Sequence, residues 1–351
     1  MTTSSASSFH DRLDRGPLLV AEGYIFALER RGALKAGPFV PEAVLSQPET
    51  VLQLHHEFLR AGSDVSVACT YYAHRSKLKA VDREDALEAL NRQALRLARQ
   101  AAADYDALTA GNLSNTWEYE PGNPASEKVV RGIFEEQVEW AAAEQADFII
   151  AETFGHLGEA RLALEAIKAG GLPAVITFSP ATGSACDGYS WEDACKVLED
   201  EGAAVVGLNC GNGPATMLPH LERIRRRVDG HVAGLPVPYR TNDDHPCFQK
   251  LLLDDGKTAF PLALDPFLLT RFEMADFAAR AQKMGVDYIG ICCGAGAHHV
   301  RAMAEALGRM PPASRYSPDM GLHPIFGDKD TRHQHVQCLF GATEAPGTAD
   351  G

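Results

Sequence analysis

The feature that most constrains the fold of this 351-residue chain is a regular alternation between short apolar runs and longer amphipathic segments. Each apolar run is rich in Val, Ile and Ala, and the stretch after it has apolar residues at helical spacing, which predicts repeated strand and helix units. Strands that are apolar along nearly their whole length, alternating with helices, indicate a parallel sheet covered by helices. The expected strands are 17–23, 63–70, 106–114, 146–153, 172–180, 203–210, 231–239 and 286–294.

The number of strand–helix units predicts the fold class. About eight units favour an α/β fold of the (β/α)8 TIM barrel type, here with a C-terminal arm. A doubly wound parallel sheet is the alternative. The expected helices are 48–62, 83–103, 127–145, 157–171, 191–202, 215–228, 271–285 and 297–310.

The chain is expected to form one barrel domain with a short extension at each end. Residues 1–15 are polar and are predicted to be a flexible lead-in, and 16–310 are predicted to form the barrel. Residues 311–351 lack periodicity and are predicted to be a partly disordered arm that packs on a neighbouring subunit. The segment 240–266 is a long insertion after the seventh strand, and long loops at that end of a barrel usually cap a site.

Composition excludes several classes of partner. The formal net charge of −14 argues against non-specific binding to nucleic acid or to an anionic membrane. The N-terminus lacks the apolar run of a signal peptide, and no apolar stretch approaches the length of a transmembrane helix, so we expect a cytoplasmic protein. The eight cysteines are scattered, which fits metal or catalytic roles in a reducing compartment better than a disulfide framework.

Three of the cysteines stand at the ends of two expected strands. Cys210 ends the sixth strand, and Cys292 and Cys293 end the eighth. The C-terminal ends of barrel strands meet on the face that carries the active site, so we expect these thiols to be neighbours. The other cysteines are expected to be small core residues: Cys69, Cys186, Cys195, Cys247 and Cys338.

Three thiolates around one point are a soft ligand set, for which zinc is the usual metal. Three protein ligands leave a fourth position open, which is typical of a catalytic rather than a structural site. Zinc deprotonates a substrate thiol near neutral pH. The sulfur stays nucleophilic on an electron-rich metal, so the predicted chemistry is thiolate attack on an activated alkyl group. A vicinal-thiol redox switch and a site for another soft metal are the alternatives.

Two motifs carry a resemblance to a known family. The sequences GLNC (207–210) and GICCG (290–294) resemble the zinc motifs of the homocysteine S-methyltransferase family. The resemblance runs from about residue 16 to about residue 320 and is closest to the betaine-using members of that family. The longer segments that carry it are 23–44, 53–65, 147–156 and 285–307.

The resemblance implies an S-methyltransferase that binds one Zn²⁺ and forms methionine from homocysteine. Cys210, Cys292 and Cys293 would be both the zinc ligands and the catalytic residues. Glu22 and Glu152 match acidic positions at the ends of the first and fourth strands, and would hold the ammonium group of homocysteine.

The resemblance also implies a betaine-like methyl donor. Phe39 and Tyr72 match positions where betaine-using members place aromatic rings, whose faces bind a quaternary ammonium group through cation–π contacts. Thr70 and Asn209 are expected among the substrate-binding residues. The implied partners are small molecules, with no nucleic acid and no membrane, and we expect a homodimer or homotetramer.

The chain departs from the family's pattern around these pockets. The first-strand motif DGG is AEG at 21–23, Phe39 replaces a tryptophan, Thr153 replaces a tyrosine, Ala68 replaces a hydroxyl residue, and Ile291 adds bulk beside the cysteine pair. Two alternative functions therefore stay open. One is a homocysteine methyltransferase with a sulfonium donor, either dimethylsulfoniopropionate or S-methylmethionine. The other is a non-catalytic barrel that binds zinc or thiols.

Overall fold

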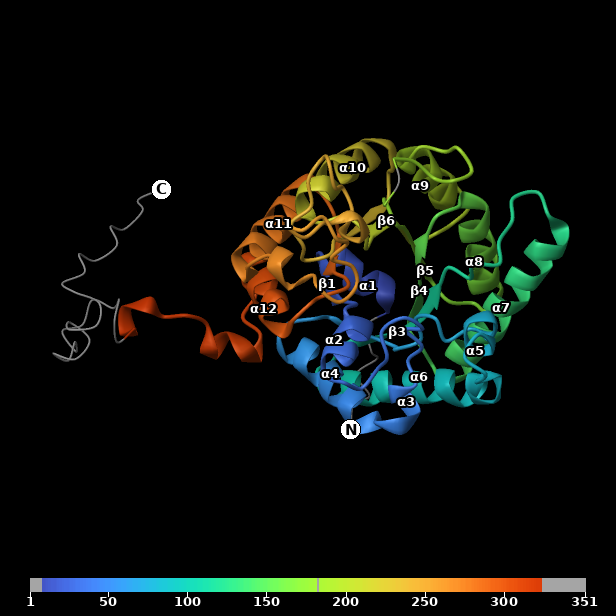
Figure 1. The fold of residues 1–351 in the computed structure, drawn as a ribbon, viewed down its shortest axis with the longest axis horizontal. Coiled ribbons are helices and arrows are strands. Elements are labelled where there is room, and N and C mark those ends of the chain that lie inside the picture. The colour runs from blue at the N-terminus through green and yellow to red at the C-terminus, as the bar shows by residue number, and fades with distance from the viewer. Residues whose placement is uncertain (1–7, 182, 324–351) are drawn as a thin grey trace. The chain divides into compact units, whose positions relative to one another are not determined.

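Eight parallel strands form a closed barrel in the computed structural model, which describes residues 8–181 and 183–323 (Figure 1). Each strand pairs with its neighbour in sequence, and β1 closes the ring on β8, with Leu18 opposite Tyr288 and Ala21 opposite Ile291. The (β/α)8 prediction is therefore confirmed, and the doubly wound alternative is wrong. The strands are β1 Leu18–Ala21, β2 Val65–Val67, β3 Leu108–Ser114, β4 Phe148–Phe154, β5 Ala174–Phe178, β6 Val205–Asn209, β7 His231–Leu235 and β8 Tyr288–Ile291.

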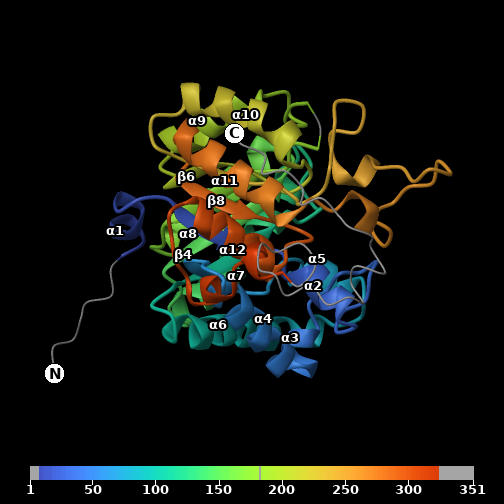
Figure 2. The same ribbon diagram turned by 90° about the vertical axis from the view of Figure 1, so that its left-hand side faces the viewer.

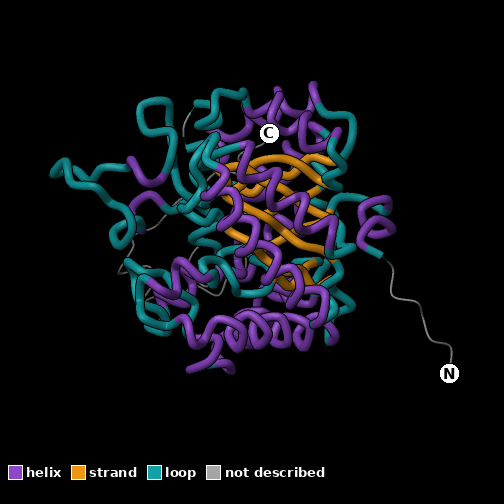
Figure 3. The backbone as a smooth tube through the Cα atoms, turned by 90° about the vertical axis from the view of Figure 1, so that its right-hand side faces the viewer, coloured by secondary structure: helices purple, strands orange, loops and turns teal. Residues whose placement is uncertain are grey.

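Helices surround the strands and cover the outer face of the barrel (Figures 1 and 3). The eight predicted helices are all present, with ends that differ by a few residues. The helices are α1 Phe9–Asp14, α2 Tyr24–Arg30, α3 Ala43–Ser46, α4 Pro48–Arg60, α5 Arg75–Lys79, α6 Leu87–Ala103, α7 Pro124–Ala143, α8 Leu157–Ala169, α9 Trp191–Asp200, α10 Pro214–Arg227, α11 Arg271–Met284 and α12 Ala297–Ala306.

Local sequence signals explain these elements. Six of the eight strands are buried at every residue, because side chains inside the barrel and side chains under the helices are both shielded from water. Helix α11 begins with a capping box between Thr270 and Glu273 and ends at Gly285, whose φ of 87° favours glycine. Among the described helices, none has both the length and the apolar character needed to cross a bilayer.

The N-terminal segment is more ordered than its composition predicts. The structure describes the chain from Ser8, and α1 begins there with a capping box between Ser8 and Asp11. The Phe9 ring is buried and stacks on Phe148 of β4, with ring centroids 4.1 Å apart, and Leu13 is also buried. The prediction of a flexible lead-in is wrong for residues 8–15, because apolar residues four apart give α1 a face that packs on the barrel.

The C-terminal arm forms a second unit. The chain divides into a unit that ends at Pro312 and a unit that begins at Ala313, close to the predicted boundary between 310 and 311. The described part of the arm holds two short 3₁₀ helices, Pro312–Tyr316 and Met320–Leu322. Residues 324–351 lie outside the described residues, so disorder there and packing on a neighbouring subunit stay predictions.

The long insertion after β7 is present as predicted. Between β7 and α11 the chain forms only two 3₁₀ helices, Phe248–Lys250 and Asp265–Phe267. The insertion, orange in Figure 2, projects from the same end of the barrel as α2 and α5, whereas α1 lies at the opposite end. Figure 3 shows the same separation from the other side. The insertion is therefore on the face where the strands end and where a barrel carries its site.

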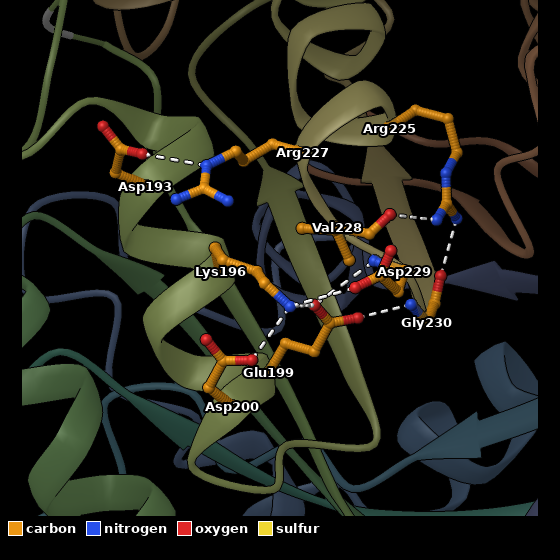
Figure 4. A network of polar contacts seen from close by, with 9 residues as sticks. All are labelled: Asp193, Lys196, Glu199, Asp200, Arg225, Arg227, Val228, Asp229 and Gly230. Atoms are coloured by element: carbon orange, nitrogen blue, oxygen red, sulfur yellow. Dashed lines mark hydrogen bonds and ion pairs between the residues drawn. The ribbon is translucent and has the colours of Figure 1, made fainter.

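A polar network fixes the turn that leads into β7 (Figure 4). The Lys196 ammonium on α9 contacts Glu199 and Asp200 at 2.9 Å and Asp229 at 3.1 Å. Arg225, at the end of α10, donates to the carbonyls of Val228 and Gly230. The network joins two neighbouring helices to the start of the strand whose other end contacts the thiol cluster described below.

The packing of α1 on the barrel leads to a stability prediction. Phe9→Ala removes a buried ring, and we expect it to lower the free energy of unfolding by about 3–5 kcal/mol in urea denaturation. The matched control is His10→Ala on the exposed side of the same helix, which should change that free energy by no more than about 0.5 kcal/mol. Equal, small effects of the two substitutions would contradict the packing of α1.

Candidate metal and substrate site

Three thiols meet at the C-terminal end of the barrel. Cys210 directly follows β6, and Cys292 and Cys293 directly follow β8. The Sγ atom of Cys293 lies 3.8 Å from that of Cys210 and 4.0 Å from that of Cys292, and all three lie within 4.8 Å of one another. None of the three forms a disulfide. The arrangement can hold one soft metal ion and leave a coordination position free.

The backbone around the thiols is pinned to the end of β7. The amide of Cys210 donates to the Leu235 carbonyl at 2.9 Å, and that of Cys292 donates to the Pro236 carbonyl at the same distance. Gly294 has φ 94°, and a Cβ atom there would lie 2.4 Å from the Tyr239 hydroxyl oxygen, so only glycine fits. The thiols are therefore held on short, tightly constrained turns.

The pKa values of the three thiols shift in different directions. Hydrogen bonds from Cys292 and then Cys293 hold the pKa of Cys210 well below its ordinary value. The same contacts with Cys210 raise the pKa of Cys292 and of Cys293 well above the ordinary value. One thiolate is thus favoured and its neighbours keep their protons, because adjacent negative charges repel in a buried site. A bound cation would relieve that repulsion.

Glu152 lies beside the thiols and is held by amide groups. Its Oε1 accepts a hydrogen bond from Asn112 Nδ2 at 2.5 Å, and its Oε2 accepts one from Asn209 Nδ2. The amide of Thr153 and the hydroxyl of Thr177 both donate to Asn209 Oδ1 at 2.9 Å. Asn209 is therefore a fully buried linker whose Nδ2 also approaches Cys292 Sγ at 3.9 Å.

Thr70 lies one step further from the cavity. Its hydroxyl donates to the Asn112 carbonyl at 2.7 Å, and neither Thr70 nor Asn209 lines the cavity described below. Their predicted role in binding substrate could therefore only be indirect, through the positions of Asn112 and Glu152.

Glu22 completes a second group that could hold a cation. One oxygen each of Glu22 and Glu152 and the sulfur of Cys292 all lie within 4.8 Å of one another. The Oε2 atom of Glu22 is buried without a hydrogen-bond partner in the described part of the chain. Burial, and then repulsion from Glu152, raises the pKa of Glu22 well above its usual range. Burial raises the pKa of Glu152 to about 7, although its hydrogen bond from Asn112 opposes the shift.

These groups line a cavity of about 450 Å³. One side is a phenyl wall of Phe26, Phe39, Phe248 and Phe260, in which the Phe26 and Phe39 rings stack with centroids 5.6 Å apart. Phe248 and Phe260 come from the insertion after β7, so the insertion helps to enclose the site as predicted.

A second aromatic group lines the cavity and consists of Tyr71, Tyr72, Trp117 and Tyr119. The Tyr72 ring lies 4.4 Å from Tyr71 and 6.4 Å from Trp117, centroid to centroid. Of this group, only Tyr72 was predicted from the sequence. Trp117 and Tyr119 lie in the motif NTWEYE, which begins directly after β3. Residues just beyond the end of a barrel strand line the active-site face, so the position of these aromatic residues could have predicted their place in the cavity.

Backbone strain is concentrated at the cavity. Eight non-glycine residues in the described part of the chain have positive φ, a conformation that is costly for residues with a Cβ atom. Five of them line the cavity, and such outliers are typical of functional sites. These five are Phe39, Tyr72, Trp117, Thr153 and Cys210.

Two sequence-based interpretations need correction. Ile291 is fully buried and does not line the cavity, because alternation along β8 places its side chain on the opposite face from Gly290 and Cys292. Its bulk therefore does not reshape the substrate pocket. Cys186 is exposed rather than a core residue, because it lies in the loop between β5 and α9. Cys69, Cys195 and Cys247 are buried as expected, and Cys338 lies outside the described residues.

Comparisons with known proteins agree on one family. Residues 23–307 match the family model of homocysteine S-methyltransferase. Betaine–homocysteine S-methyltransferase 1 from Xenopus tropicalis is 36% identical over 326 residues, which cover 89% of this chain and 79% of the relative. The Rattus norvegicus protein of the same name is 38% identical over 87% of this chain and 76% of its own length.

Two further proteins extend the comparison. An S-methylmethionine–homocysteine S-methyltransferase from Pongo abelii is 36% identical over 87% of this chain and 83% of its own length. The structure of the homocysteine methyltransferase MmuM from Escherichia coli, in its metallated form, has a TM-score of 0.67 at 19% identity and covers 84% of this chain and 98% of MmuM. At that identity the structural match supports the fold.

The close packing of Gly23 leads to a prediction about metal binding. A Cβ atom on Gly23 would lie 2.6 Å from the Cβ of Ala295 and 3.1 Å from the Cys292 carbonyl oxygen. Gly23→Ala should therefore displace the turn that carries Cys292 and Cys293. We expect zinc affinity, measured by competition with a chromophoric chelator, to fall by about 10- to 100-fold.

The matched control is Gly132→Ala on α7, where a Cβ atom meets nothing within 4 Å. That substitution should leave zinc affinity unchanged and slightly stabilise the helix. Unchanged zinc affinity in both variants would contradict the packing described for the Cys292 turn.

Proposed function

This chain belongs to the homocysteine S-methyltransferase family, and on that premise we propose that it forms methionine by transferring a methyl group from a betaine-like quaternary ammonium donor to the sulfur of homocysteine, with zinc as its metal. The observation that carries the proposal is the meeting of three thiols with two buried carboxyl groups in the lining of one largely aromatic cavity. Soft ligands, a site for an ammonium group and aromatic walls are the three elements that this reaction needs.

The donor set fits zinc. The ion would be held by Cys210, Cys292 and Cys293. Their three thiols, from two strand ends, lie within 4.8 Å of one another, and none of them forms a disulfide. When bound, zinc lowers the pKa of a substrate thiol, so that the sulfur is available as a nucleophile near neutral pH. The short, pinned turns around the cysteines keep this ligand set in place.

The two carboxyl groups suit the ammonium group of homocysteine. Glu152 is already oriented by Asn112 and Asn209, whereas Glu22 offers a buried oxygen that lacks a partner in the described residues. A positive charge placed between them would offset the burial that raises both pKa values and the repulsion from Glu152 that further raises that of Glu22. Since Glu22, Glu152 and Cys292 are neighbours, an amino acid held by its ammonium group would have its thiol directed toward the cysteines.

The aromatic walls suit the methyl donor. A quaternary ammonium group neither donates nor accepts hydrogen bonds, and ring faces are its natural partners. Both Phe39 and Tyr72 line the cavity, as the proposed donor contacts require. The transfer is a single in-line displacement, in which the sulfur–carbon bond forms as the carbon–nitrogen bond breaks. The residues of this chain contribute by aligning the two substrates and excluding water.

A sulfonium donor is the second candidate. The relative named for S-methylmethionine is 36% identical to this chain, which equals the identity of one betaine-named relative. Aromatic faces also bind sulfonium cations, so the walls alone do not select between the donors.

We also propose a cytoplasmic location and a homodimer or homotetramer. The location is supported by the seven free cysteines among the described residues, because such thiols persist in a reducing compartment. The oligomeric state rests on the resemblance to the family.

The test is methionine formation by the zinc-loaded full chain. We expect turnover from homocysteine with glycine betaine, measured beside dimethylsulfoniopropionate and S-methylmethionine. Cys292→Ser removes one soft ligand, and we expect zinc affinity and turnover both to fall by more than about 100-fold. The control is Cys195→Ala, a buried cysteine outside the cavity, which should keep both.

Three outcomes would contradict parts of this proposal. Turnover only with a sulfonium donor would replace the betaine assignment. Full zinc occupancy without methionine from any donor would favour a non-catalytic zinc-binding barrel. Retention of zinc and activity in Cys292→Ser would remove the role of the thiol cluster.

A further inference from the structure

A lysine of the protein lies against the aromatic group that includes Tyr72. Lys77 on α5 places its Nζ atom 4.2 Å from the centroid of the Tyr72 ring and 5.8 Å from that of Trp117. Both distances are within cation–π range, and both rings line the cavity. One face of the ring proposed to bind a substrate cation is therefore engaged by a cation of the protein itself.

In the described part of the chain, no ion pair neutralises the charge of Lys77. Among residues 8–181 and 183–323, no carboxylate lies within ion-pair distance of Lys77, although the chain carries a net charge of −14. Lys196 and Lys257, by contrast, both pair with acidic side chains. Burial lowers the pKa of Lys77, as expected for an ammonium group that lacks a compensating anion.

Charges of opposite sign therefore lie around the cavity in two places, although Lys77 contacts two of the lining rings and is not itself a lining residue. Glu22 and Glu152 lie beside the thiols, and Lys77 lies at the Tyr72 and Trp117 rings. The phenyl wall of Phe26, Phe39, Phe248 and Phe260 carries no charge. A donor with a positive end and a negative end would be oriented by this distribution, with its methyl-bearing cation toward the thiols and its anion toward Lys77.

We propose that Lys77 is a specificity-determining residue that binds the carboxylate of a zwitterionic methyl donor and disfavours donors that carry only positive charge. The inference rests on the proposed methyl transfer and adds the residue that recognises the anionic end of the donor. The flexible stem of a lysine allows Nζ to leave the ring face and meet a carboxylate. A donor without an anion would bring a second positive charge to rings that Lys77 already covers, and like charges repel.

The experiment compares two ligands with the same trimethylammonium group. Glycine betaine carries a carboxylate, whereas choline carries a neutral hydroxyl group. Their dissociation constants are measured by calorimetry on the zinc-loaded full chain with methionine in place of homocysteine, so that no methyl group is transferred during the titration. The KM values for glycine betaine and homocysteine are measured in separate turnover assays.

Lys77→Met keeps the apolar stem and removes the charge. We expect it to weaken glycine betaine binding by about 10- to 100-fold, the usual effect of losing a hydrogen bond to a charged group. Choline should bind more tightly to this variant than to the original chain, and the KM for homocysteine should not change. Lys77→Arg should restore most of the preference for glycine betaine. The matched control is Lys79→Met, an exposed residue of the same helix, which should change none of these values.

Opposite shifts for the two ligands distinguish recognition from a structural role, which would weaken both. Equal shifts, an unchanged ratio, or no binding of glycine betaine to the original chain would each overturn the inference. Methionine formation with an unchanged ratio in Lys77→Met would overturn the role of Lys77 alone. Absence of methionine from every donor, with opposite shifts in binding, would overturn the proposed reaction and leave the recognition role supported.

Discussion

The pairing of β1 with β8 is the constraint on which the rest of the structure depends. It closes the ring, with Leu18 opposite Tyr288 and Ala21 opposite Ile291, and thereby brings the end of the first strand to the end of the last. Glu22 follows directly after β1 and Cys292 directly after β8, so this pairing places a carboxyl group beside a thiol 270 positions later in the chain. Closure also brings β6 and β4 to the same rim, which adds Cys210 and Glu152. Helix α1 packs on β4 through Phe9 and Phe148, at the end of the barrel away from the insertion.

The site that forms when the barrel closes contains features that lower the stability of the folded protein. Five cavity residues have left-handed backbone conformations, two buried carboxyl groups lie close together, and three thiols lie within 4.8 Å of one another. Each feature costs stability, and a cation or a cationic substrate would relieve the repulsion among the carboxyl groups and the thiols. The well-packed barrel around the site supplies the stability that these features remove. The same reasoning applies to Lys77, whose charge lacks a carboxylate partner among the described residues.

Much of this could be predicted from the sequence, because alternating apolar strands and amphipathic helices leave few topologies open. The convergence of Cys210 with Cys292 and Cys293 followed from the barrel alone, since strand ends meet on one face. What could not be predicted depends on side-chain direction and on loops. The side chain of Ile291 points away from the cavity because of its position on β8. Asn209 is fully buried and acts on the site through its hydrogen bond to Glu152. The helix at Phe9–Asp14 was not predicted, because only two apolar residues, Phe9 and Leu13, stand among polar ones in that stretch. The contact of Lys77 with Tyr72 depends on the three-dimensional position of α5 and has no signal in the sequence.

The central claim is that three cysteines from two strand ends hold the metal of a methyltransferase. X-ray absorption at the zinc edge of the zinc-loaded full chain tests it most directly, because the method counts the sulfur neighbours of the ion. We expect three sulfur neighbours at about 2.3 Å in the absence of substrate and a fourth when homocysteine is added. Zinc surrounded mainly by nitrogen and oxygen, or a sulfur count that homocysteine leaves unchanged, would contradict it.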